Sequence, residues 1–174
     1  MTDCRNAVVA WGHWGVANRH QFTYTEGANR MAEIGEPGNL PVTCDCSAFV
    51  TLCYNWAGVK NDPNGQHYDH EGYTGTLLAH GTEVPVRNVA PGDIVIYGGG
   101  AGEHAALVIE NHNGTDIMTI SMGEQGDPSY VWVATPKTVP DKGVVADNRK
   151  PVRYLRFNTV GTPKMPPAVE PKVE

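Results

Sequence analysis

Residues 43–49 read Thr-Cys-Asp-Cys-Ser-Ala-Phe, so two cysteines flank a single aspartate. Three interpretations compete: half of a metal site, half of a disulfide, or a nucleophile at the start of a helix. Within residues 45–57, apolar side chains follow Cys46 at spacings of 3, 4, 7 and 11, which is typical of one helix face. Asp45 stands where an N-cap belongs, and Gly58 is a C-terminal helix signal. The stretch therefore predicts a helix that begins near Cys46.

A zinc site is the first alternative. Zinc ligands usually come as Cys-x2–4-Cys pairs with a second pair downstream, whereas Cys44 and Cys46 have one residue between them. His67 and His70 would have to complete the site, and their spacing does not support that role. We therefore expect two exposed loop histidines and no bound metal.

A disulfide is the second alternative. Cys46 and Cys53 are seven residues apart, which on a helix separates them by about 10.5 Å along the axis. Disulfide partners need Cα atoms within about 7 Å of each other, so this pair is excluded on a helix. We expect Cys53 to be a small buried hydrophobe. A Cys4–Cys44 pair stays open.

The third interpretation makes Cys46 a nucleophile. Free N–H groups and the positive dipole end at a helix start favour a thiolate, and the same N–H groups can stabilise an oxyanion. The reaction also needs a base, and His104 is the leading candidate. It begins an expected strand directly after the glycine-rich residues 98–102, where small side chains leave room for a substrate.

The order of elements predicts an α+β domain. A helix is expected at 5–18 and a long loop at 60–73, and from residue 84 onward the pattern changes to strands. Asn113-Gly114 signals a hairpin between two of these strands. The expected strands are 93–97, 104–110, 116–121, 130–134 and 152–157.

Composition bounds the function. The 174 residues are enough for one domain, which we expect at 1–160, followed by a proline-rich tail or linker at 161–174. A net charge of −6 argues against a nucleic-acid partner. No stretch is long and apolar enough for a membrane span, and no signal peptide is visible at the N-terminus. We expect a monomer without a membrane partner.

Three motifs carry a family resemblance. Residues 45–50, Asp-Cys-Ser-Ala-Phe-Val, resemble the Asp-Cys-Ser-Gly-Phe/Leu-Val motif of NlpC-type cysteine peptidases. Residues 91–95, Pro-Gly-Asp-Ile-Val, and 104–108, His-Ala-Ala-Leu-Val, are similar to the two strand motifs that follow it in that family. The motifs stand in the family order, and the resemblance covers roughly residues 24–132.

A closer resemblance is to the N-terminal peptidase domains of phage endolysins that attack actinobacterial walls. Residues 54–58, 62–65 and 72–76 carry it. The resemblance implies a papain-like core, with the nucleophile helix packed on an antiparallel sheet. It also implies cleavage of an amide in the stem peptide or cross-bridge of bacterial peptidoglycan, and no cofactor. Such a protein is made in the host cytoplasm without a signal peptide and acts at the cell wall.

The residue that orients His104 departs from the family. Related lysins carry a histidine where this chain has Met122, which is a poor hydrogen-bond acceptor. A two-residue Asn113-Gly114 turn would place Ser121 on the same sheet face as His104. Glu124 lies just past the strand, and we favour it because a carboxylate best stabilises an imidazolium.

Three further residues are expected to contact the substrate. Tyr24 matches a tyrosine that precedes the nucleophile in the family and lines its site. Asp45 and Ser47 flank the nucleophile directly. Two other functions remain open: an amidase of the CHAP type or an acyltransferase with the same nucleophile, and a non-catalytic module that binds zinc or the wall.

Overall fold

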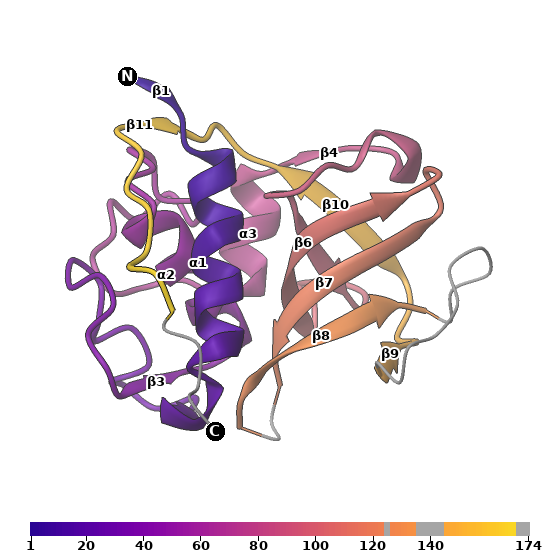
Figure 1. Ribbon diagram of the computed structural model, residues 1–174. Helices are drawn as coiled ribbons and strands as arrows, with labels where there is room; N and C mark the ends of the chain where they lie inside the picture. Colours follow the sequence, from indigo (N-terminus) through magenta and orange to yellow (C-terminus); the bar gives the residue numbers. More distant parts are fainter. Residues whose placement is uncertain (124–125, 135–144, 170–174) are drawn as a thin grey trace.

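The computed structural model describes residues 1–123, 126–134 and 145–169. Helices lie on one side of a large sheet, as Figure 1 shows. The helices are α1 (Arg5–Ala17), α2 (Cys46–Trp56) and α3 (Thr74–His80), with short 3-10 turns at Arg19–Gln21 and Val86–Asn88. The arrangement is the α+β fold that the sequence predicts, with α2, the helix that begins at Cys46, against the sheet.

Among the described residues, the large sheet has seven strands. Their spatial order is β4 (Thr82–Glu83), β10 (Val152–Arg156), β5 (Ile94–Tyr97), β6 (His104–His112), β7 (Asp116–Met122), β8 (Pro128–Val133) and β9 (Val145–Asp147). All neighbours are antiparallel except β8 and β9, which are parallel. The sheet is therefore mixed: β5 to β8 follow one another as antiparallel neighbours, whereas β9 joins β8 in parallel.

Two small strand pairs close the ends of the domain. β1 (Thr2–Asp3) pairs with β11 (Val160–Gly161), and β2 (Phe22–Tyr24) runs parallel to β3 (Val42–Cys44). Beyond β11, the Lys164 backbone donates to Ala57 and its carbonyl accepts from the Trp11 indole. The domain boundary at residue 160 stays a prediction, and residues 162–164 lie against the helices through hydrogen bonds to Gly58, Ala57 and Trp11.

The β6–β7 hairpin reaches its expected register by an unexpected route. Its loop has three residues, because His112 pairs with Asp116, whereas the sequence predicts a two-residue turn. A β-bulge between Val108 and Glu110 then shifts the pairing by one position. Leu107 pairs with Ile120 as a result, which is the register that the shorter turn would have produced.

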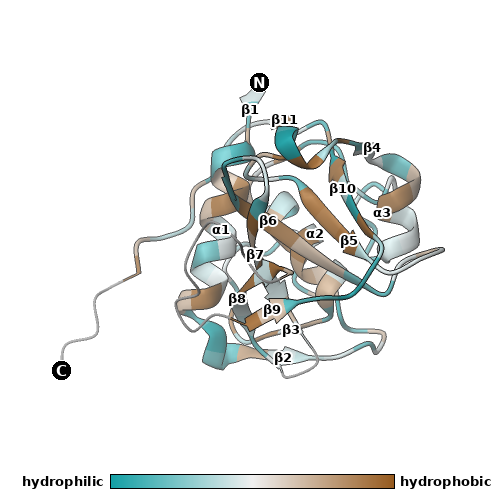
Figure 2. Ribbon diagram, turned by 90° about the vertical axis from the view of Figure 1, so that its right-hand side faces the viewer, coloured by the Kyte–Doolittle hydropathy of each residue, from teal (hydrophilic) through white to brown (hydrophobic). Residues whose placement is uncertain are grey.

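The sheet separates two buried clusters. The larger one lies between the sheet and the helices, and it includes Leu107 and Met122. The smaller one lies on the other face and includes Tyr97 and Ala106. The alternation of side chains along a strand explains this division, and Figure 2 shows the apolar strands β5 and β6 crossing the middle of the sheet.

Close packing of α1 and α2 on the sheet explains two glycines in α1. A Cβ atom at Gly12 would lie 2.8 Å from Leu107, and one at Gly15 would lie 2.9 Å from Phe49. Both distances are shorter than real Cβ contacts, so glycine is needed for the helix to approach β6 and α2 at this distance. α1 therefore packs directly against both β6 and α2.

The helix predicted around Cys46 forms as expected. The Asp45 side chain accepts a hydrogen bond from the Ala48 N–H at 2.8 Å, and Gly58 has φ 88° directly after the helix. Cys53 lies in the core at 2% exposure. The sequence analysis missed α3, which is seven residues long and includes a glycine.

Candidate active site

Cys46 is the first residue of α2, and its side chain is 8% exposed. Its sulfur faces the start of β6, where the backbone N–H of Ala105 lies close enough to lower the thiol pKa. The N–H groups of Ser47 and of Cys46 itself act in the same direction. The helix start and the strand that begins with His104 therefore meet at this sulfur.

Burial nevertheless raises the pKa of the Cys46 thiol, and the nearby Asp45 carboxylate raises it further. The three N–H groups offset this only in part. The sequence prediction that the helix start favours a thiolate is therefore wrong for the free protein, because desolvation outweighs the N–H groups. Cys46 rests as a neutral thiol.

His104 begins β6 and is also buried, at 6% exposure. Its imidazole stacks on the ring of Tyr97, the residue opposite it on β5, with centroids 5.7 Å apart and planes 27° apart. Burial lowers the pKa of His104 to about 4, and the Arg149 guanidinium contributes in the same direction. At neutral pH the ring is therefore an uncharged imidazole that can accept a proton.

Ser121 on β7 holds the other side of this ring. Its Oγ lies 2.5 Å from His104 Nε2. Met122 is fully buried among the residues that pack against the helices, so the side chain on the face of His104 is Ser121. Glu124, the favoured candidate from the sequence, lies outside the described residues, and its role stays a prediction.

Within the part of the chain that the structure describes, no hydrogen bond joins Cys46 and His104. The N–H that reaches the sulfur belongs to Ala105, the residue after the histidine. Because Ser121 occupies Nε2, Nδ1 is the ring nitrogen that remains for a proton from the thiol. Hydrogen bonds of this kind are often long in free enzymes and shorten in the substrate complex.

The three residues expected to contact substrate differ in exposure. Tyr24 lines a cavity with His104, and its hydroxyl donates to Glu26 at 3.1 Å. Asp45 caps α2 and also accepts from Arg30 at 3.2 Å. Ser47 is 2% exposed and donates to Asp45, so its placement favours a supporting role.

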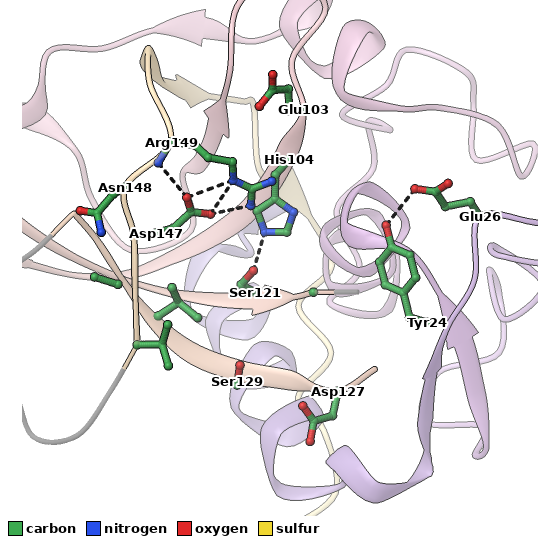
Figure 3. Close-up of a pocket in the computed structure, with 14 residues that line it drawn as sticks. Tyr24, Glu26, Glu103, His104, Ser121, Asp127, Ser129, Asp147, Asn148 and Arg149 are labelled. Carbon is green, nitrogen blue, oxygen red and sulfur yellow. Dashed lines mark hydrogen bonds and ion pairs between the residues drawn. The ribbon is translucent and has the colours of Figure 1, made fainter. Parts of the chain in front are cut away.

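The cavity beside His104 has a volume of about 460 Å³. Figure 3 shows Tyr24 and Glu26 on one side of it and Asp147 and Arg149 near His104 on the other. The polar lining is Tyr24, Glu26, Glu103, His104, Ser121, Asp127, Ser129, Asp147, Asn148 and Arg149. The size suits a short peptide segment.

The sequence analysis missed Asp147 and Arg149. The Arg149 guanidinium binds both carboxylate oxygens of Asp147, at 2.6 to 3.1 Å. Its carbon Cζ also lies 5.6 Å from the centroid of the Tyr97 ring. The pairing of β9 with β8 brings this segment back to the site, and no motif in the sequence indicates that contact.

A zinc site does not form at the opening motif. Among the described residues, no group of three or more His, Cys, Asp or Glu side chains is arranged to hold a metal ion. Cys4, Cys44, Cys46 and Cys53 are all free thiols and all buried. The Cys4–Cys44 pair that the sequence leaves open is therefore not a disulfide here. No helix among the described residues is long and apolar enough to cross a membrane.

The family follows from a direct comparison. The sequence profile of the NlpC/P60 family matches residues 24–125, more than half of the chain, and this range includes Cys46, His104 and Ser121. The chain belongs to the NlpC/P60 family. A search among curated proteins finds no match for this NlpC/P60 chain.

Two solved structures similar to this NlpC/P60 chain are proteins of Mycobacterium tuberculosis. RipD, a non-catalytic NlpC/p60 domain protein adapted to peptidoglycan binding, is 16% identical over 90% of this chain and 98% of its own, with a TM-score of 0.53. A hypothetical invasion protein is 17% identical over 88% of this chain and 62% of its own, with a TM-score of 0.52.

A third similar structure is the peptidoglycan hydrolase RipB of the same organism. It is 19% identical over 88% of this chain and 66% of its own, with a TM-score of 0.47. The chain thus spans less than two thirds of the length of RipB and of the invasion protein. At these identities the structural comparisons show the fold alone.

Proposed function

We propose that this NlpC/P60 domain is a cysteine hydrolase that cleaves an amide bond in the peptide part of bacterial peptidoglycan. The observation that carries the proposal is the meeting of Cys46, at the start of α2, with the first residues of β6, where His104 is held by Ser121. Nucleophilic catalysis by cysteine requires a base near the thiol and a third group that orients the base, and Cys46, His104 and Ser121 would fill these roles.

Acylation begins with a proton transfer. The thiol proton of Cys46 passes to Nδ1 of His104 while the sulfur attacks the amide carbon and the C–S bond forms. His104 then gives this proton to the amide nitrogen, the C–N bond breaks and the amine leaves. The resting neutral pair suits this order, because His104 is uncharged above its pKa of about 4 and can accept the proton at neutral pH.

Deacylation uses the same histidine. His104 takes a proton from water, the hydroxide attacks the thioester carbon, and the C–S bond breaks as His104 returns that proton to the sulfur, which releases a carboxylic acid and the Cys46 thiol. The N–H groups of Cys46 and Ser47 at the start of α2 are available for the oxyanion, because the cap Asp45 occupies that of Ala48.

A non-catalytic role is the second candidate. Cys46 and His104 are both neutral and share no hydrogen bond among the described contacts, and RipD shows that this fold also serves peptidoglycan binding. In that case the cavity beside His104 would hold a wall peptide without cleaving it. An amidase or acyltransferase reaction would use the same Cys46 and is distinguished by its products.

Purified bacterial cell walls provide the test. The wild-type protein and Cys46→Ala are incubated with walls, the soluble products are identified by mass, and protein that sediments with the walls is measured in parallel. We expect new peptide termini with the wild type only, and equal sedimentation of both proteins. Sedimentation without products from either protein would favour the binding module. A role as a phage endolysin further predicts lysis when the protein is applied to actinobacterial walls.

A further inference from the structure

The wall of the site behind His104 is a stack of three side chains from separate parts of the chain. The His104 ring lies on Tyr97 with centroids 5.7 Å apart, and the guanidinium of Arg149 lies over Tyr97 at 5.6 Å. Asp147 fixes Arg149 with hydrogen bonds of 3.0, 3.1 and 2.6 Å. Figure 3 shows the Asp147–Arg149 pair directly beside the imidazole.

We propose that the Asp147–Arg149 ion pair is a positioning element for His104. Asp147 holds the guanidinium over Tyr97, the guanidinium fixes the tyrosine ring, and the tyrosine ring is the surface on which the imidazole stacks. Bidentate pairing holds the fork of Arg149 in one orientation, and that orientation keeps the guanidinium over the Tyr97 ring. Ser121 alone anchors one atom of the imidazole, so it leaves the ring free to rotate about that contact.

The pair also balances charge at the imidazole. Arg149 lowers the pKa of His104 and Asp147 raises it, after the larger lowering by burial. Among the described residues, Arg149 and Asp147 are the charged groups that shift the pKa of His104. The other polar and titratable groups that contact the ring or line its cavity are Tyr97 from β5, Ser121 from β7, Asp127 and Ser129 at β8, Tyr24 and Glu26 at or after β2, Asn148 after β9, and the preceding Glu103, while Cys46 of α2 lies against the N–H of Ala105.

Replacing one member of the ion pair by an uncharged residue therefore leaves the charge of the other without a compensating partner. With Arg149→Met, Asp147 stands unopposed and the pKa of His104 rises. With Asp147→Asn, Arg149 stands unopposed and the pKa of His104 falls. In the double variant both charges are gone, so the two changes cancel in large part. If the ion pair only stabilised the fold, the two single variants would not shift the pKa of His104 in opposite directions.

The effect of the ion pair on the pKa of His104 is tested without a catalysed reaction. His104 is titrated by NMR in the Cys46→Ala protein, and its signal is identified by its loss in His104→Gln. Arg149→Met must raise the pKa, Asp147→Asn must not, and the double variant must return toward the parent value. Equal shifts in both single variants, or none, would overturn the proposal. The titration needs no catalysis, so a failure of this proposal can be told apart from a failure of the proposed hydrolysis.

The positioning half rests on the proposed function and uses kcat and KM for a soluble peptide cut in the wall digestion. We expect Arg149→Lys to lower kcat roughly tenfold, with KM unchanged and the His104 pKa kept low, because lysine keeps the charge but not the planar fork. The exposed Arg19→Met and Asp69→Asn are the matched charge controls. A rise in KM alone would mean that Arg149 binds substrate directly, and it would overturn the positioning role.

Discussion

The Nε2 atom of His104 lies 2.5 Å from the Oγ of Ser121, although the bulge-shifted register places Ser121 diagonally across from it on β7. A serine hydroxyl can donate to an unprotonated ring nitrogen or accept from a protonated one. Because Nδ1 must be free to take the thiol proton, the neutral ring carries its own proton on Nε2, and Ser121 Oγ accepts from this N–H both before and after the transfer. A methionine at this position would offer only a weak acceptor, and Met122 is turned into the core instead.

Replacement of Ser121 by alanine should lower kcat roughly 10- to 100-fold, with little change in KM, because the imidazole loses the contact that orients it. Ser129 is the matched control, since it pairs with Ser121 across β7 and β8 and lines the same cavity without bonding His104. Ser129→Ala should keep near-normal kcat. The measurement is steady-state kinetics on a soluble wall peptide.

Glu124→Gln completes this comparison. If Ser121 orients His104, Glu124→Gln should have a smaller effect on kcat than Ser121→Ala. A full kcat in Ser121→Ala together with a large loss in Glu124→Gln would return the role to the carboxylate that we favoured from the sequence.

The cap of the nucleophile helix should be measurable as stability. Asp45→Ala removes the acceptor of the Ala48 N–H and should lower the free energy of unfolding by about 1 kcal/mol. Asp45→Asn keeps an acceptor oxygen and should lose less, although it weakens the ion pair with Arg30. Urea unfolding of both variants checks this order. Equal losses would show that the charge of Asp45, rather than its cap, stabilises the helix.

Cys46 should react slowly with iodoacetamide at pH 7, because burial raises the pKa of its thiol. The rate should rise about tenfold per pH unit on the alkaline side until the thiol titrates. Asp45→Asn should speed the reaction, since the Asp45 carboxylate raises the same pKa. Peptide mapping by mass identifies the labelled cysteine. Fast labelling that stays constant down to pH 5 would mean that Cys46 and His104 form a resting ion pair.

His104 should make the fold sensitive to acid. Its pKa is about 4 when folded and about 6.5 when unfolded, so the unfolded chain binds the extra proton between these values. Stability is therefore complete above pH 6.5 and falls as the pH drops toward 4, by about 3 kcal/mol at most. Unfolding curves of wild type and His104→Gln across this range measure the effect. An identical pH dependence in both proteins would contradict the buried neutral imidazole.

The sequence was informative where one short segment determines the structure. The cap at Asp45, the helix that follows it and the strand that begins at His104 all depend on local spacing, and all formed as predicted. The two-residue turn at Asn113-Gly114 was wrong, yet Ser121 still reached the face of His104, because the bulge restored the register. Ser121 lies on the predicted face because two differences from the prediction, the longer turn and the bulge, cancel each other.

The rest of the site depends on contacts that sequence spacing does not encode. Arg149 reaches Tyr97 only because β9 pairs in parallel with β8, and that pairing follows from the tertiary fold. The state of Cys46 was missed for a related reason. A helix start favours a thiolate locally, but burial under neighbouring elements reverses the balance, and burial appears only once the chain is packed.

The central claim is that Cys46 attacks a peptide amide of the wall with His104 as its base. Mass analysis of walls digested by the wild type and by Cys46→Ala, with sedimentation to show that both proteins still bind, tests it most directly. The account predicts new peptide termini from the wild type and none from Cys46→Ala at equal binding. The same products from Cys46→Ala at an undiminished rate would contradict it.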